Sequence, residues 1–218
     1  TASVAGTGAG SVGGQVAFNP QTQNQRAALA MVNGKVIIAW ASHCDTGPYH
    51  GWIMAYNASN LTQAWATNIT ANGSNGGIWQ SGGGLSADTA GNLYALTGNG
   101  SFSGDTGGTN FGNSFIKVSP AGALLDWFTP YNWSFLNATD EDLGVQNPVL
   151  IPNTNLIVGG GKDGVMYVVN RTNMGHFRSG NNGQIVQSFQ GSTATRMNGA
   201  PVYWNSPTYG PAIYVWPA

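Results

Sequence analysis

Charged side chains are scarce in this 218-residue chain. Asp, Glu, Lys and Arg together make up 7% of it, against about 25% in typical soluble domains. The formal net charge of −1 produces no long-range field that would attract nucleic acid or an anionic membrane surface. We therefore expect no nucleic-acid partner. Solubility must come from uncharged polar residues, chiefly Asn, Ser, Thr, Gln and Gly.

Long apolar runs are missing as well. No stretch approaches the roughly 18 residues of a membrane-spanning helix, so we expect no membrane insertion. No signal peptide is visible at Thr1, so any such segment has been removed or lies upstream. Low charge combined with abundant Asn, Thr and Gly favours an extracellular, cell-surface or periplasmic location.

Such a location would expose Asn-x-Ser/Thr sequons to glycosylation, although a chain rich in these residues also forms the triplet by chance. The acceptor positions are Asn57, Asn60, Asn68, Asn72, Asn99, Asn132, Asn137 and Asn170.

A second cysteine is also missing, because Cys44 is the only one. An internal disulfide is therefore excluded. Three readings of Cys44 remain open: a partly buried small side chain, a residue paired outside this segment, or a metal ligand.

Helical periodicity is absent, and this sets the fold class. Apolar residues recur at spacing two or in short blocks bounded by Gly, Asn, Pro and Asp, which predicts strands and turns. The clearest hairpin signal is Asn33-Gly34 between the apolar runs 27–32 and 35–41, because both residues tolerate the positive φ of a type I′ turn. Residues 1–14 are small and Gly-rich and predict an irregular connection.

The strand pattern repeats along the chain. Turns between first and second strands are expected at Asn33, Gly91, Asn153 and Pro207, roughly 55 to 60 residues apart, which is typical of β-propeller blades with long loops. We predict an all-β fold, a β-propeller segment of about three and a half four-stranded antiparallel blades. A β-sandwich or barrel is the alternative.

The whole chain, 1–218, is expected to be a single propeller segment. Its blades are expected at about 27–68, 83–130, 147–190 and, incomplete, 199–218. A lone four-stranded sheet has two apolar faces to bury, so each blade needs neighbours. We therefore expect the remaining blades, from the same or another chain, to be partners.

The third repeat carries a family resemblance. The segment from Pro148 to Gly175 resembles a blade of the quinoprotein-like propellers, which include alcohol dehydrogenases that use pyrroloquinoline quinone (PQQ). The matching positions are Lys162, Gly164, Tyr167, Val168, Val169, Arg171 and Gly175. Asn170 replaces the usual Asp. Tyr49–Trp52 and Trp79–Gly84 also resemble segments of uncharacterised secreted PQQ-like propeller proteins of bacteria.

Upstream, Asp140-Glu-Asp142 stands where those enzymes carry a Trp-Asp-x-Asp motif, with Thr139 in place of the Trp. The resemblance implies Lys162 as a cation for the quinone, Asp140 as a source of oxygen for Ca²⁺ or the cofactor, and Asp142 as the catalytic base. The lid that the family builds from two adjacent cysteines is not in this chain. The alternatives are a solvated loop for 140–142 and, for Lys162, a charge at a strand end.

A second candidate site is the loop between the runs 35–41 and 51–56. It holds His43, Asp45 and His50, whose two imidazoles and one carboxylate can bind a transition metal. Their spacing fits no standard zinc signature. The alternative is a structural corner in which the histidines donate hydrogen bonds to loop carbonyls.

The expected function is a non-catalytic binding or scaffold module that recognises a glycan or protein ligand, with no cofactor required. One alternative is part of a PQQ- and Ca²⁺-dependent alcohol or sugar dehydrogenase. Another is a glycan-binding propeller in which tryptophans stack on sugars; the candidates are Trp79, Trp127, Trp133 and Trp204.

Overall fold

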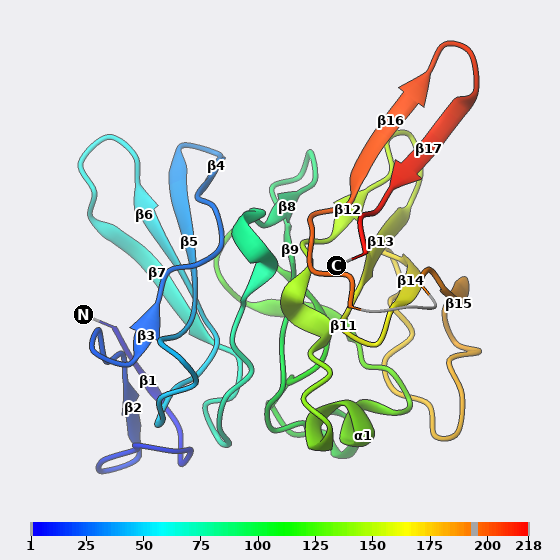
Figure 1. The fold of residues 1–218 in the computed structure, drawn as a ribbon. Coiled ribbons are helices and arrows are strands. Elements are labelled where there is room, and N and C mark those ends of the chain that lie inside the picture. Colours follow the sequence, from blue (N-terminus) through cyan, green and yellow to red (C-terminus); the bar gives the residue numbers. More distant parts are fainter. Residues whose placement is uncertain (1, 193–195, 218) are drawn as a thin grey trace.

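The computed structural model describes residues 2–192 and 196–217. Three antiparallel sheets are stacked side by side, with a two-stranded hairpin at either end of the stack (Figure 1). Strand accounts for 39% of the chain and helix for 7%, which confirms the all-β class. In the described part of the chain, no helix is long and apolar enough to cross a membrane.

Each sheet is built from strands that follow one another in the chain. The first contains β3 (Gln23–Asn24), β4 (Ala30–Val32), β5 (Lys35–Ser42), β6 (Trp52–Asn57) and β7 (Gln63–Asn68). The second contains β8 (Ser86–Ala87), β9 (Leu93–Leu96), β10 (Phe115–Val118) and β11 (Leu124–Phe128). The third contains β12 (Val149–Leu150), β13 (Leu156–Gly160), β14 (Val165–Asn170) and β15 (Gln187–Gln190).

Within residues 2–192 and 196–217, the remaining elements are two hairpins and four short helices. The hairpins are β1 (Ser3–Ala5) with β2 (Gln15–Ala17), and β16 (Val202–Ser206) with β17 (Gly210–Tyr214). The helices are η1 (Gln80–Gly82), η2 (Gly104–Thr106), α1 (Trp133–Ala138) and η3 (Leu143–Val145). The meander order of the sheets confirms the predicted propeller segment.

The β4–β5 turn, residues 1–14 and the helix α1 can each be compared with what the sequence predicted. The β4–β5 turn has Asn33 at φ 48° and Gly34 at φ 71°, so the predicted type I′ hairpin is confirmed. Two expectations were wrong. Residues 1–14 include strand β1, which forms because it packs on the first sheet, and six residues form α1, which is too short to leave a readable helical period.

Alternate residues of each strand face opposite neighbours. On β9, Leu93 and Ala95 belong to the core between the first and second sheets, whereas Tyr94 and Leu96 belong to the core between the second and third. Both faces of the second sheet are therefore buried, which is what a period of two in an apolar strand requires when sheets stack on either side.

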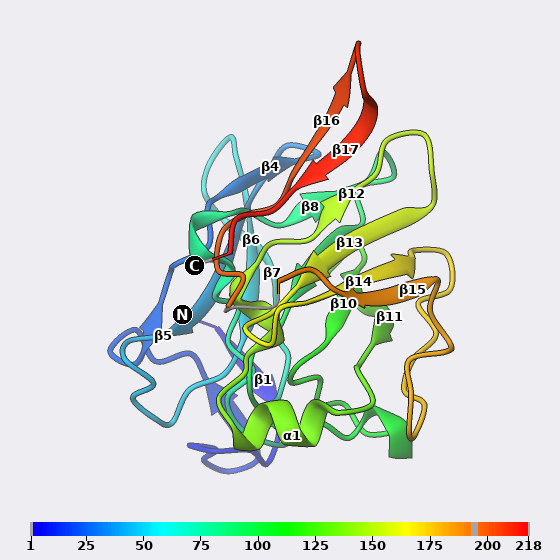
Figure 2. The same cartoon turned by 45° about the vertical axis from the view of Figure 1, so that its right-hand side comes forward.

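The two hairpins pack on the outer faces of the stack. The β1–β2 hairpin covers Trp52 and Met54 of the first sheet with Ala2 and Val16. The β16–β17 hairpin lies on the third sheet through Ile213. It extends away from the other sheets (Figures 1 and 2).

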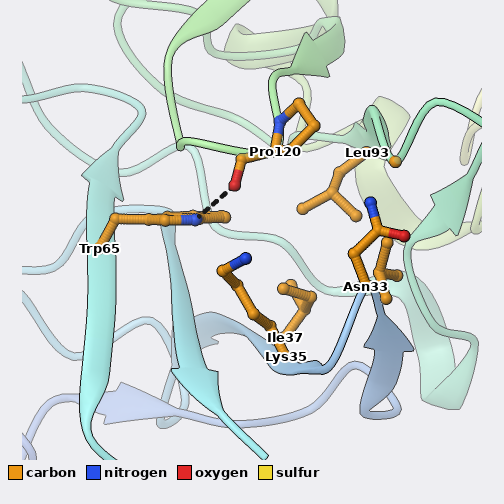
Figure 3. Close-up of a pocket in the computed structure, with 8 residues that line it drawn as sticks. Asn33, Lys35, Ile37, Trp65, Leu93 and Pro120 are labelled. Atoms are coloured by element: carbon orange, nitrogen blue, oxygen red, sulfur yellow. Dashed lines mark hydrogen bonds between the residues drawn. The ribbon is translucent and has the colours of Figure 1, made fainter.

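The seam between the first and second sheets is tightly filled (Figure 3). Trp65 on β7 crosses it, and its indole N–H donates to the Pro120 carbonyl oxygen over 3.0 Å. The space left beside Ile37 and Leu93 is about 10 Å³, barely enough for one water molecule. This seam is an inter-sheet packing contact and offers no room for a ligand.

If stacking of these sheets holds the fold together, removing a buried ring between them must be costly. Phe128 is fully buried against Phe115 and Tyr167. We expect Phe128→Ala to lower the free energy of unfolding by about 3–5 kcal/mol, measured by urea denaturation followed by circular dichroism. Val12→Ala, at a position 81% exposed, is the control and should change it by about 0.5 kcal/mol or less. Equal effects of the two variants would contradict the stacked core.

Candidate functional site

A pocket of about 250 Å³ opens where loops from all three sheets converge. It lies at the end of the sheets that carries the β5–β6 and β13–β14 loops, away from the Asn33–Gly34 turn. Its lining residues are Arg26, Asp45, Trp79, Asp142, Val145, Lys162, Arg196 and Asn198. The two sites predicted separately from the sequence thus meet, since Asp45 comes from one and Lys162 and Asp142 from the other.

Lys162, in the β13–β14 turn, is the centre of an ion-pair network. Its Nζ lies 2.5 Å from Asp142 Oδ2 and 3.1 Å from Asp140 Oδ2. It also donates to the Asp140 carbonyl oxygen over 3.0 Å. An ammonium group has three hydrogens to donate, so these three acceptors use all of them.

Asp142 is held from its other side by Asn99. Asp142 Oδ1 accepts the Asn99 backbone N–H over 2.7 Å, and the Asn99 side-chain amide donates to Asp140 Oδ1 over 3.1 Å. Asn113 in turn donates to Asn99 Oδ1 over 2.8 Å. Both oxygens of Asp142 are therefore occupied by donors.

Sequence reasoning assigned Asn99 only as a glycosylation acceptor. One feature of the sequence could have indicated that Asn99 belongs to this network. Asn99 follows the second strand of its repeat, which is the loop position that Lys162 occupies in the next repeat.

Two glycines make this arrangement possible. A Cβ on Gly98 would overlap Asp142 Oδ1 and the Trp79 indole, and a Cβ on Gly144 would lie 2.5 Å from the Gly98 nitrogen. Only glycine lets the two loops approach this closely. Their contact brings Asp142, just before η3, against the loop that follows β9.

Burial and pairing act on both charged groups. Burial raises the pKa of the Asp142 carboxyl, and hydrogen bonds from Lys162 and Asn99 offset part of that rise. Burial alone would lower the pKa of Lys162, but hydrogen bonds and charges of Asp142 and Asp140 more than compensate and raise it. Lys162 therefore stays protonated at neutral pH.

Trp79 forms an aromatic wall of the pocket. The Arg26 guanidinium lies 5.6 Å from the centre of its ring, a cation–π distance, and Tyr49 meets it edge-on at 6.1 Å. The Tyr49 hydroxyl donates to Asp45 Oδ1 over 3.0 Å. Burial and the Asp45 charge raise the pKa of Tyr49, so it remains a neutral donor that positions Asp45.

The structure does not bring His43, Asp45 and His50 together. His50 is buried, with Nδ1 3.0 Å from Thr70 Oγ1 and Nε2 2.9 Å from the Ala9 carbonyl oxygen, while His43 is exposed. Burial lowers the pKa of His50. Within residues 2–192 and 196–217, no group of three or more His, Cys, Asp or Glu side chains could hold a metal ion.

Cys44 differs from the partly buried side chain considered above. Cys44 lies in the loop between β5 and β6, where its side chain is exposed. Its φ of 50° is a turn conformation.

A PQQ–Ca²⁺ site requires a cation for the quinone, oxygen ligands for Ca²⁺ and a carboxylate that acts as a base. The Trp79 ring and the cations Arg26 and Arg196 suit a planar anionic ring. The Lys162 ammonium, however, has no donor left for a quinone while it is bonded as described. In this arrangement Lys162 does not fit the part of a cofactor-binding cation, and we assign no chemical step to the cofactor.

The tryptophans proposed for sugar stacking lie in different surroundings. Trp127 is packed by Phe102 and Phe111 and stacks on His176 at 4.6 Å. Trp133 contacts Phe102 at 5.2 Å. Trp204 is 50% exposed. Trp127 therefore fills an aromatic cluster, whereas Trp204 keeps an accessible face.

No protein-family model and no curated protein match the chain. Solved structures do. A quinohemoprotein alcohol dehydrogenase from Pseudomonas putida HK5 is 19% identical over 81% of this chain, with a TM-score of 0.59. A europium-containing methanol dehydrogenase is 15% identical over 81% of it, with a TM-score of 0.58. The fold is that of a PQQ-like β-propeller.

A quinohemoprotein alcohol dehydrogenase from Comamonas testosteroni matches 71% of the chain at 19% identity, with a TM-score of 0.50. The matched part spans only 28% to 36% of the length of these three proteins. At these identities the PQQ-like likeness is one of fold.

The ion-pair network predicts a pH-dependent stability. Because Lys162 has a raised pKa in the folded state, its contribution is fully present below its unfolded pKa of about 10.4 and is lost as the pH rises through the folded value. Lys162→Gln should cost about 3 kcal/mol at pH 7, because it leaves Asp142 unpaired and buried. The difference from wild type should shrink above about pH 10.

Urea denaturation between pH 7 and 12 measures this. The control is His176→Gln, which removes the His176–Asp126 hydrogen bond and the stacking on Trp127 and should cost about 1–2 kcal/mol with no dependence on Lys162. A Lys162→Gln penalty that stays constant across this pH range would contradict the pairing.

Proposed function

We propose that the chain is part of an extracytoplasmic PQQ-like propeller that serves as a non-catalytic binding or scaffold module. The observation that carries this proposal is the mutual engagement of Lys162 and Asp142. A cofactor-binding cation needs free donors, which the Lys162 ammonium lacks. A general base must reach the substrate proton, whereas the Asp142 carboxyl is buried and its charge is compensated by Lys162. Both groups instead join the loops of the second and third sheets.

The rest of the pocket supports a polar ligand. Asn198 Oδ1 is buried and has no hydrogen-bond partner in the described part of the chain, so it is available to a ligand donor. Arg196 and Arg26 supply donors on exposed side chains. A pocket of about 250 Å³ is smaller than most drug-sized sites and suits one sugar ring or a single protein side chain.

A scaffold role is supported by the β16–β17 hairpin. Its outward side chains Val202, Trp204 and Tyr214 are 57%, 50% and 51% exposed, whereas the sheet faces that meet inside the stack are buried. Contiguous exposed apolar surface of this kind marks an interaction site. We propose a further propeller sheet, from the same or another chain, as its partner.

A PQQ- and Ca²⁺-dependent dehydrogenase is the competing function. It is motivated by the presence of Lys162, Asp142 and Trp79 in a single pocket of a chain whose fold is like that of alcohol and methanol dehydrogenases. It would require the Lys162–Asp142 pair to open.

Titration with PQQ and Ca²⁺ separates the two functions. We expect no saturable quenching of tryptophan emission and no dye-linked oxidation of methanol, ethanol or glucose, because the two key side chains stay paired. Trp79→Phe identifies the part of any quenching that arises in the pocket. Quenching that saturates at micromolar quinone and disappears in Lys162→Gln would overturn the non-catalytic proposal.

A further inference from the structure

A second cleft, of about 160 Å³, opens between the second and third sheets. It lies at the opposite end of the strands from the pocket, beside the turns that precede β9 and β13. Its lining residues are Asp88, Thr89, Ala90, Tyr94, Lys117, Asn155, Arg171 and Thr172.

Two of the chain's seven basic residues converge in this cleft, one from each sheet. Lys117 on β10 donates to the Arg171 carbonyl oxygen over 3.0 Å, and Arg171 follows β14 and donates from Nη2 to the Thr154 carbonyl oxygen over 2.7 Å. Neither forms an ion pair with a described carboxylate. Arg171 Nε is buried without a partner among the described residues.

The only carboxylate in the cleft does not neutralise them. Asp88 Oδ1 accepts the backbone N–H groups of Ala90 and Asn92, and Oδ2 accepts the Asn92 side chain and the Tyr94 hydroxyl, all at 2.9–3.0 Å. Both carboxylate oxygens of Asp88 thus accept hydrogen bonds from residues of the same turn and of the strand β9 that follows it. Lys117 and Arg171 outweigh its single charge, so the cleft carries a net positive charge.

The matching junction between the first and second sheets provides a comparison. The seam of Figure 3 is also lined by the turns that precede the second strands, and it also contains a lysine, Lys35. There Trp65 and Pro120 fill the space to about 10 Å³. Only the second junction combines open volume with two converging cations.

We propose that this cleft binds a small inorganic oxyanion, phosphate or sulfate. The Lys117 ammonium has two hydrogens not used by the Arg171 carbonyl. The Thr89 hydroxyl and the Asn155 amide add neutral hydrogen-bonding groups to the lining of the cleft. Charge-assisted hydrogen bonds to oxyanions are among the strongest available to a protein surface. The site is independent of the pocket that contains Lys162.

Nuclear magnetic resonance titration with sodium phosphate and with sodium sulfate tests this, with sodium chloride at equal ionic strength as reference. We expect saturable shifts of the Arg171 and Thr172 amides and of Arg171 Nε–H with a dissociation constant on the order of 1 mM. Lys117→Gln retains a donor to the Arg171 carbonyl and should weaken binding about tenfold, as expected for losing one charge-assisted contact.

Lys35→Gln is the matched control, because it removes the same charge at the filled junction, and it should leave the affinity within about twofold. Lys117→Arg keeps the charge and should stay within about threefold. Circular dichroism checks that each variant is folded. Thr89→Ala, at an exposed position, removes a neutral hydroxyl from the cleft and leaves both of its cations in place. Shifts that do not saturate, or an equal loss in Lys35→Gln and Lys117→Gln, would overturn the proposal.

Discussion

The need to cover both apolar faces of every sheet determines the rest of this structure. Strands such as β9 place Leu93 on one face and Tyr94 on the other, and both are buried by neighbouring sheets. Stacking therefore aligns the strand ends of successive sheets. The loops at one end converge on the pocket with Lys162, and the turns at the other end form the cleft with Lys117. Both candidate sites are consequences of the stack.

In a chain with so little charge, the Lys162–Asp142–Asp140 network is a concentrated electrostatic feature. A buried ion pair adds little net stability compared with apolar packing, yet losing one partner is costly because the other is left uncompensated. The network therefore specifies how two loops fit together. The close approach of Gly98 and Gly144 provides the space for that fit, and Asn99 and Asn113 extend the network into the loop between β9 and β10.

Much of the fold could be predicted, because strand periodicity and turn chemistry are local. Asn33-Gly34 encodes its hairpin directly. Packing decided the rest: β1 forms because the first sheet covers it. For the pocket, sequence reasoning selected Lys162, Asp142 and Asp45 but placed them in two sites, because their convergence depends on three sheets. Asn99 is marked only by its loop position after β9, and Arg26 carries no motif that marks its long-range contacts.

Lys162 and Asp142 hold one another, and the Lys162 ammonium is left with no free donor. The most direct test is the nitrogen-15 resonance of the Lys162 ammonium group, recorded with and without PQQ and Ca²⁺. We expect a slowly exchanging ammonium signal that is coupled to the Asp142 carboxyl carbon and unchanged by the additions. A signal that exchanges rapidly, or a coupling that disappears when the quinone is added, would contradict it.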